Sequence, residues 1–226
     1  MSRFDPRVEA LPETFPVFPL AGALLLPRGK LPLNIFEPRY LALVEDALAA
    51  GRMFGMIQPD PAAPAAGDAP GLYRIGCLGR ISSFSETEDG RYLITLTGLL
   101  RFALAEEAAP RRGYRLVRAA YDAYLGDLSG DPQPPLPPAG VVEREALLAA
   151  LRGYFTRRGF DANWDAIRRM PDEDLVVTLA MVCPFPPAEK QALLEAAGET
   201  ERAATLLALL QMGAAAPDDS SDHRVS

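Results

Sequence analysis

A serine nucleophile in this chain would need a neighbouring base, and the sequence offers few candidates. The two lysines are Lys30 and Lys190, and the single histidine is His223. Lys30 has no serine nearby in the sequence, and we expect Lys190 to lie on the exposed face of a helix. An activating lysine must instead be desolvated beside its nucleophile. His223 lies in a small, polar C-terminal segment, which makes a poorly preorganised base. We therefore expect no catalytic residues and no enzyme activity.

Residues 22–30, GALLLPRGK, superficially have the composition of a phosphate-binding loop. A P-loop has four residues between its glycines and a Ser or Thr directly after its lysine. Here six residues separate Gly22 from Gly29, and Leu31 follows the lysine, so no hydroxyl is placed to hold magnesium. The segment predicts a structural turn, and we expect no cofactor.

Acidic clusters and cysteines are the candidate metal ligands. Two short acidic clusters are present: Glu86, Glu88 and Asp89, then Asp172, Glu173 and Asp174. The first group fits a solvated hairpin tip. The second fits the first turn of a helix, where carboxylates complement exposed N–H groups. Neither has the spacing of a calcium loop. Cys77 and Cys183 lie far apart in apolar surroundings, which is typical of buried reduced thiols. We expect no metal.

Four arginines form the one basic concentration in the chain: Arg111, Arg112, Arg115 and Arg118. They lack interleaved lysines, and the chain has a net charge of -7. Residues 1–125 contain 14 basic and 14 acidic side chains, whereas residues 126–226 contain 9 and 16. A basic footprint for nucleic acid is therefore absent from the sequence, and we expect no nucleic-acid partner. RNA binding stays a minor alternative.

The segment Glu37-Pro38-Arg39-Tyr40 has two interpretations. In the architectural interpretation Glu37 caps a helix, Pro38 starts it, and Arg39 and Tyr40 brace the helix against a sheet. In the functional interpretation Phe36, Arg39 and Tyr40 form the edge of a groove that binds an exposed apolar peptide. Aromatic residues at helix starts commonly belong to the core, which favours the first interpretation.

The elements around this segment read as short strands and one helix. Pro16, Pro19, Pro27 and Pro32 prevent a single long helix or a central strand, although the residues between them are apolar. Residues 38–50 predict a helix that ends near Gly51. Residues 53–57 predict a strand, residues 73–104 a hairpin turning at Asp89-Gly90, and residues 114–125 a further strand. The glycines at 76 and 79 indicate close backbone contact.

Composition changes after residue 125. Residues 126–140 contain five prolines and predict a linker. Apolar residues then recur with helical spacing, which predicts a helical subdomain over residues 141–213. Residues 214–226 are small and polar, and we expect disorder there. The apolar run from Val17 to Leu26 is too short to span a bilayer. The first residues, MSRFDP, do not form the apolar core of a signal peptide. We expect a cytoplasmic protein with no membrane partner.

Three segments resemble one known family. They are LPLNIFEPRY at residues 31–40, YRIGCLGRIS with LITLTGLLRF at residues 73–82 and 93–102, and EKQALLEAAGETERAATLLALLQ at residues 189–211. Together they resemble the Lon protease N-terminal, substrate-binding domain family. The resemblance implies an α+β fold, in which a PUA-like β pseudo-barrel with one helix over residues 1–125 precedes a C-terminal α-helical bundle. It also implies a stand-alone member without the ATPase and Ser-Lys protease domains.

The same resemblance implies a non-catalytic module that binds protein or peptide, with unfolded or exposed hydrophobic segments as partners. An adaptor that docks onto one specific folded partner is the alternative, and its docking surface would be the acidic helical half. The PUA-like barrel also keeps the RNA-binding alternative open. The identity of the ligand and the oligomeric state do not follow from the sequence.

Overall fold

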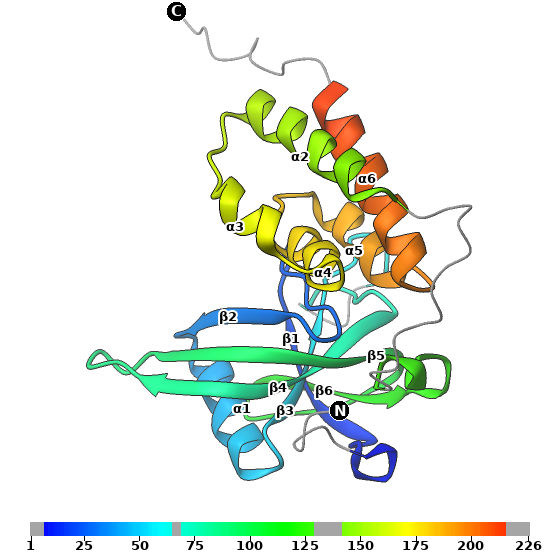
Figure 1. Ribbon diagram of the computed structural model, residues 1–226. Helices are drawn as coiled ribbons and strands as arrows, with labels where there is room; N and C mark the ends of the chain where they lie inside the picture. The colour runs from blue at the N-terminus through cyan, green and yellow to red at the C-terminus, as the bar shows by residue number, and fades with distance from the viewer. Residues whose placement is uncertain (1–6, 65–68, 129–141, 216–226) are drawn as a thin grey trace, which may run out of the picture. The chain divides into compact units, whose positions relative to one another are not determined.

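A computed structural model describes residues 7–64, 69–128 and 142–215 of the chain (Figure 1). The chain forms two compact units: the first comprises Met1–Pro132 and Val177–Glu195, and the second comprises Gln133–Val176 and Ala196–Ser226. The expected domain boundaries at residues 125 and 141 stay a prediction, and most of the expected linker lies outside the described residues.

The first unit is built on a mixed sheet of six strands. The strands are β1 (Thr14–Pro19), β2 (Lys30–Ile35), β3 (Met53–Ile57), β4 (Ile75–Glu86), β5 (Tyr92–Arg111) and β6 (Tyr114–Ala120). Their order is β2-β5-β4-β3-β1-β6, and β6 also pairs with β5. Strands β1, β3, β4, β5 and β6 therefore close into a ring, while β2 pairs with the N-terminal part of β5, residues 92–97. Only β1 and β3 run parallel among the described pairs.

Strand β2 lies at the open end of this order. It pairs with β5 from Lys30 opposite Thr97 to Ile35 opposite Tyr92. Pro32 has no backbone N–H and is tolerated here because an edge strand needs partners on one side only. The proline-interrupted segment thus forms an edge strand, as its composition predicts.

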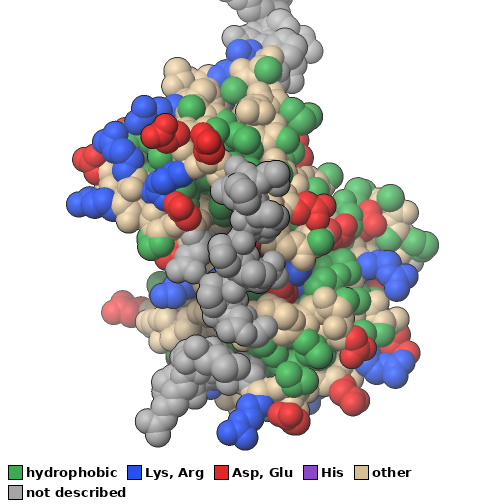
Figure 2. Space-filling model, turned by 45° about the vertical axis from the view of Figure 1, so that its right-hand side comes forward, with side chains coloured by type: hydrophobic (Ala, Val, Ile, Leu, Met, Phe, Trp, Pro, Cys, Tyr) green, Lys and Arg blue, Asp and Glu red, His purple; other side chains and the backbone are tan. Residues whose placement is uncertain are grey.

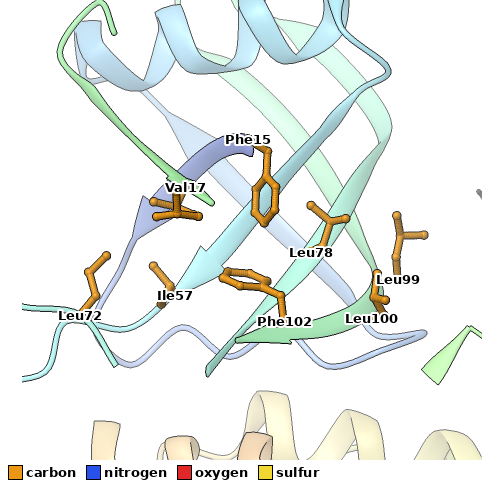
Figure 3. Close-up of a cluster of buried hydrophobic side chains, with 9 residues drawn as sticks. Phe15, Val17, Ile57, Leu72, Leu78, Leu99, Leu100 and Phe102 are labelled. Atoms are coloured by element: carbon orange, nitrogen blue, oxygen red, sulfur yellow. The ribbon is translucent and has the colours of Figure 1, made fainter. Parts of the chain in front are cut away.

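The core of the ring comes from inward-facing residues of several strands (Figure 3). The buried cluster contains Phe15, Val17, Ile57, Leu72, Leu78, Leu99, Leu100, Phe102 and Val117. The rings of Phe15 and Phe102 meet edge to face with centroids 5.0 Å apart. Each such buried aromatic side chain contributes about 1.5–3 kcal/mol through removal of apolar surface from water. These contacts hold β1 against β5, far apart in the sequence.

Helix α1 (Pro38–Ala49) packs against β1, β3 and β6. Pro38 occupies the first turn, where a missing N–H costs nothing, and Gly51 has a positive φ of 85° just past the end. The helix expected over residues 38–50 is confirmed. Its buried face consists of Tyr40, Ala42, Leu43, Val44 and Ala47.

The expected hairpin is present as β4 and β5, but its turn is longer than Asp89-Gly90. Strand β4 ends at Glu86 and β5 begins at Tyr92. The N–H of Thr87 donates to the carbonyl of Arg91, with an N–O distance of 2.9 Å, so the connection spans five residues. Only Gly90 has a positive φ among these residues, whereas a two-residue type I′ turn needs two such residues.

The β4 glycines allow the close approach expected of them. A Cβ on Gly76 would lie 2.5 Å from Cζ of Phe102, and one on Gly79 would lie 2.5 Å from Cγ of Leu96. The register shifts between Leu78 and Gly79, which marks a bulge.

After β6 the chain forms a short 3-10 helix, η2 (Asp122–Asp127), where β6 was expected to continue to residue 125. Asp127 falls inside the expected 126–140 linker, yet it accepts three hydrogen bonds from Arg101. The backbone N and Nε of Arg101 lie 3.0 and 2.9 Å from Oδ2, and an Nη lies 2.9 Å from Oδ1. The side chains are only 5% and 14% exposed. Asp127 is therefore a structural residue.

Two glutamines connect β3 to helix α5 (Pro187–Glu195) inside the first unit. Nε2 of Gln58 donates to the Pro187 carbonyl at 3.0 Å and to Oε1 of Gln191 at 3.1 Å. Nε2 of Gln191 in turn donates to the Ile75 carbonyl at 3.1 Å. Both glutamines are buried, so these bonds satisfy groups that would otherwise cost stability.

The described part of the second unit is helical. Its elements are α2 (Arg144–Arg158), α3 (Trp164–Arg169), the start of α4 (Asp172–Val182) and α6 (Glu199–Ala215). Helices α2 and α6 pack side by side, with Leu151 and Leu210 fully buried. Arg144 pairs with Asp172 and donates to the carbonyls of residues 167 and 168, which ties α2 to α3 and α4.

The α+β class and the C-terminal helical region expected from the sequence are confirmed. The expected disordered tail begins at residue 214, but α6 continues to Ala215, and residues 216–226 lie outside the described residues. Within the described residues, no helix is long and apolar enough to cross a membrane.

Candidate functional site

The start of helix α1 is fixed by backbone bonds and not by a side-chain cap. The Glu37 carbonyl accepts hydrogen bonds from the N–H groups of Tyr40 and Leu41, each at 2.9 Å. The Glu37 carboxylate instead binds Arg39, with 3.0 Å between Oε2 and Nε. Glu37 therefore occupies the predicted N-cap position, but its carboxylate pairs with Arg39 and makes no capping hydrogen bond.

Arg39 and Tyr40 line a cavity of about 390 Å³ in the first unit. Its described lining residues are Pro19, Arg39, Tyr40, Pro59, Ala69, Pro70, Gly113, Tyr114 and Arg115. The prolines and tyrosines give it apolar walls, and two guanidinium groups add polar ones. Such a composition suits a ligand that is itself mostly apolar with a few polar groups.

Tyr40 forms part of the cavity wall and part of the core. Its ring lies 4.0 Å from the ring of Phe18, measured between centroids, and the Arg39 guanidinium lies 4.6 Å from the Tyr40 centroid. Burial raises the pKa of the Tyr40 hydroxyl above its ordinary value. The hydroxyl therefore stays protonated at physiological pH and can donate or accept a hydrogen bond.

The arginines around the cavity are paired with carboxylates. Arg115 binds Glu107 through two hydrogen bonds, at 2.8 and 2.6 Å, and also donates to the Pro70 carbonyl at 2.7 Å. Arg118, which does not line this cavity, binds Glu106 at 2.6 Å. These pairs lower the positive potential of the arginine concentration noted in the sequence.

Tyr114 and Asp46 join β6 to α1 beside the cavity. The Tyr114 hydroxyl donates to Oδ2 of Asp46 at 2.6 Å, and Arg112 donates to Oδ1 at 2.9 Å. The Tyr114 bond, followed by those of the arginines, lowers the pKa of Asp46. Burial and the same hydrogen bond raise the pKa of Tyr114 to about 12. Arg111 also lies 3.4 Å from Asp46.

The face shown in Figure 2 has the same mixed character, since acidic and basic side chains lie beside one another on it. The structure thus provides ion pairs for the four arginines. The expectation of no nucleic-acid partner stays a prediction.

Phe36 does not line the cavity. It follows β2 directly, its side chain is 61% exposed, and the Arg91 guanidinium lies 6.0 Å from its ring centroid. The structure therefore separates the three predicted peptide-binding residues: Arg39 and Tyr40 belong to the cavity, whereas Phe36 belongs to the β2 edge.

Other large apolar side chains are exposed on the outer half of the hairpin. Phe84 is 43% and Leu93 is 45% exposed. Phe84 pairs with Ile94, the residue after Leu93, so the alternation of strand side chains places Phe84 and Leu93 on opposite faces. Neither residue is among the predicted site residues, although apolar residues next to a hairpin turn are a usable signal.

The structure places Lys190 in a buried position. Lys190 is buried, with only 7% of its surface exposed, and its Nζ donates to the Met181 carbonyl at 3.0 Å. Its predicted exposure is wrong, because α5 uses the aliphatic stem of the lysine as part of its packed face. Burial lowers the pKa of Lys190, and the interaction with Cys183 opposes this shift.

The two cysteines are buried free thiols, as predicted. Burial raises the pKa of Cys183 to about 12, which keeps the thiol protonated and unreactive. Among the described residues, no group of three His, Cys, Asp or Glu side chains is arranged to hold a metal ion.

Comparison with known proteins agrees with this fold. The family described as the ATP-dependent protease La (LON) substrate-binding domain matches residues 14–212. The chain therefore belongs to the Lon substrate-binding domain family.

Solved structures support the same fold. The Lon N-terminal domain protein from Xanthomonas campestris shares 23% identity, with a TM-score of 0.55 over 86% of this chain and 97% of that one. The N-terminal domain of the Mycobacterium avium complex Lon protease shares 17% identity, with a TM-score of 0.54 over 87% and 97% of the two chains.

Curated relatives are much longer than the matched region. The Lon protease of Syntrophus aciditrophicus is 27% identical over 158 residues, which is 68% of this chain and 18% of that protein. Lon protease 4 of Sorangium cellulosum is 32% identical over 130 residues, which is 56% of this chain and 16% of that protein. The match thus spans less than a fifth of either relative.

Proposed function

We propose that this chain is a non-catalytic module that binds exposed, unfolded segments of other proteins. Membership of the Lon substrate-binding domain family supports a protein ligand. The observation that supports it most directly is the free edge of β2 next to the exposed ring of Phe36. A cytoplasmic location stays a prediction.

Strand addition is the binding mode that β2 favours. An extended segment laid along an unpaired edge gains main-chain hydrogen bonds without a defined sequence. Its alternate side chains would lie beside Leu31 and Leu33 on one face and near Phe36 on the other. Pro32 lacks one donor and so shortens the usable edge. Affinity is expected to be modest, because ordering a flexible segment costs entropy.

The cavity at Arg39 and Tyr40 is the second element of the proposal. Its volume of about 390 Å³ is enough for one large side chain or a short turn of peptide. Because Arg39 is half exposed and its contacts with Glu37 and the Tyr40 ring are both with near neighbours, it can turn toward a ligand carbonyl or carboxylate at small cost.

The test compares the affinity of the chain for one polypeptide in two states. In the first state the polypeptide is folded, and in the second it is kept unfolded by reducing and alkylating its cysteines. Phe36→Ser removes an exposed aromatic side chain, and Phe160→Ser is the matched control, since Phe160 is 44% exposed in the second unit. We expect Phe36→Ser to weaken binding of the unfolded form about tenfold, as partial burial of one Phe implies. Phe160→Ser should leave that affinity unchanged.

Methylating alternate backbone amides of a bound peptide should abolish binding if the peptide adds to β2. Equal binding of the folded and unfolded forms would instead favour an adaptor for a folded partner. Negligible binding of both would remove the proposal.

A further inference from the structure

A second cavity of the first unit has a different chemical character. Its volume is about 600 Å³, and it lies between the segment before β1, the second half of β5, and the region of β6 and η2. Its described lining residues are Val8, Glu9, Leu11, Glu13, Ala105, Arg118, Ala119, Ala120, Tyr121, Asp122 and Leu125.

Apolar side chains form much of this groove. Val8 is 49% and Leu125 is 36% exposed, although both are large aliphatic residues. The Tyr121 hydroxyl donates to the Pro12 carbonyl at 2.7 Å, so this phenol is already satisfied and its ring is the part left to contact a ligand. Exposed aliphatic residues gathered in a concave surface are a common mark of a binding groove.

Acidic side chains surround these apolar residues. Glu9, Glu13 and Asp122 line the groove and are exposed. Arg118 is the basic residue among the described lining residues, and it binds Glu106, which lies outside the lining, at 2.6 Å. The rim is therefore negative, in contrast to the balanced charges around the cavity at Arg39 and Tyr40.

We propose that this groove binds a short segment of a partner protein in which Lys or Arg side chains flank apolar ones. The apolar side chains would contact Val8, Leu125 and Tyr121, and the basic ones would pair with the acidic rim. The groove is separate from the proposed β2 site, because Thr97, the last β5 residue paired with β2, is eight residues from Ala105, roughly 26 Å along a strand.

The experiment uses the full chain and two labelled synthetic peptides. One repeats Leu with flanking Lys, and the other repeats Leu with flanking Glu in place of each Lys. Fluorescence anisotropy should show that the Lys peptide binds more tightly, with affinity falling as salt is raised above 0.1 M, where the screening length is about 10 Å.

The combined variant Glu9→Gln, Glu13→Gln and Asp122→Asn removes the rim charges with little change of shape. It should weaken binding of the Lys peptide about tenfold, as three exposed ion pairs imply. The control variant Glu88→Gln, Glu143→Gln and Glu145→Gln removes the same number of exposed charges elsewhere and should leave the affinity unchanged.

Amide NMR shifts of the unaltered protein test the location of the groove without any substitution that could affect folding. Titration with the Lys peptide should move the resonances of Val8, Ala105 and Tyr121. If both combined variants lose the same affinity for the Lys peptide, the net charge of the protein explains the binding, and the proposal is overturned. Shifts that appear instead on raising the protein concentration would assign the groove to a second copy of the chain. Absence of any shift would mean that no such segment binds.

Discussion

Asp127→Ala tests whether the buried ion pair of the first unit determines its stability. The substitution removes both carboxylate oxygens; the contacts that remain include the Leu194 carbonyl, 3.3 Å from an Nη of Arg101, and the Tyr124 ring, whose centroid lies 4.8 Å from the guanidinium carbon. Burial alone disfavours the charged guanidinium, but the hydrogen bonds and charge of Asp127 outweigh it and raise the pKa of Arg101. The substitution removes the group that raises this pKa, but an arginine side chain is not deprotonated in proteins, so the guanidinium stays charged without the Asp127 carboxylate.

The expected cost follows from this burial. Removing one partner of a buried ion pair typically costs about 3–5 kcal/mol. A chain of this size loses roughly 2–4 °C of melting temperature for each kcal/mol. We therefore expect the unfolding midpoint to fall by about 6–20 °C in a thermal melt followed by circular dichroism.

A matched control lies in the same short helix. Asp122 is exposed, and Asp122→Ala should change the free energy of unfolding by less than about 0.5 kcal/mol. The double variant Arg101→Met with Asp127→Leu should recover much of the loss, because it also removes the buried positive charge that Asp127 balances. If Asp127→Ala and Asp122→Ala melt at the same temperature, the reasoning is refuted.

Three further predictions concern single positions. A Cβ on Gly98 would lie 2.0 Å from the Leu26 carbonyl oxygen, so Gly98→Ala should sharply lower the denaturant concentration at the unfolding midpoint. Gly126→Ala is the control, because a Cβ there would meet no atom within 4 Å, and it should leave the midpoint unchanged. Equal midpoints for the two variants would contradict this reasoning. Because the pKa of Tyr114 is raised to about 12, its stabilising effect is fully present below the unfolded pKa of about 10 and is lost as pH rises through the folded value. Tyr114→Phe should flatten this alkaline loss of unfolding free energy, and an unchanged slope would count against the assignment. Lys190 is buried, so brief treatment of the native protein with an acylating reagent should leave it unmodified until denaturant is added, as mass spectrometry would show. Acylation of Lys190 as fast as that of the exposed Lys30 would disprove its burial.

Much of the fold could be predicted because its local patterns agree with its tertiary structure. Pro38 and Gly51 fix the ends of α1 through backbone geometry alone, and Pro32 restricts β2 to an edge. These effects depend on one residue and its immediate neighbours, so they are visible in the sequence.

Lys190 and Asp127 show what the sequence could not predict. A lysine among polar helix residues and an aspartate at the start of a proline-rich stretch both have the composition of exposed residues. Each is buried because a distant group satisfies it: the Met181 carbonyl for Lys190 and the Arg101 guanidinium for Asp127. Local composition cannot reveal such partners.

The candidate site also has a part that the sequence could predict and a part that it could not. Adjacent positions on α1 bring Arg39 and Tyr40 to one cavity, whereas their role in peptide binding stays a prediction. The opposite walls, which include Pro70 and Arg115, come from other parts of the chain. Phe36 lies only three residues before Arg39, yet the junction between β2 and α1 turns it toward a different surface.

The pairing of β1 with β6 has a consequence for synthesis on the ribosome. Thr14 finds its strand partner only at Arg118, so one side of β1 has no sheet partner until more than a hundred further residues have been translated. During that interval an apolar, hydrogen-bonding strand is available to neighbouring nascent chains, and closure of so long a loop is slow. Chaperone demand should therefore end abruptly once β6 leaves the exit tunnel.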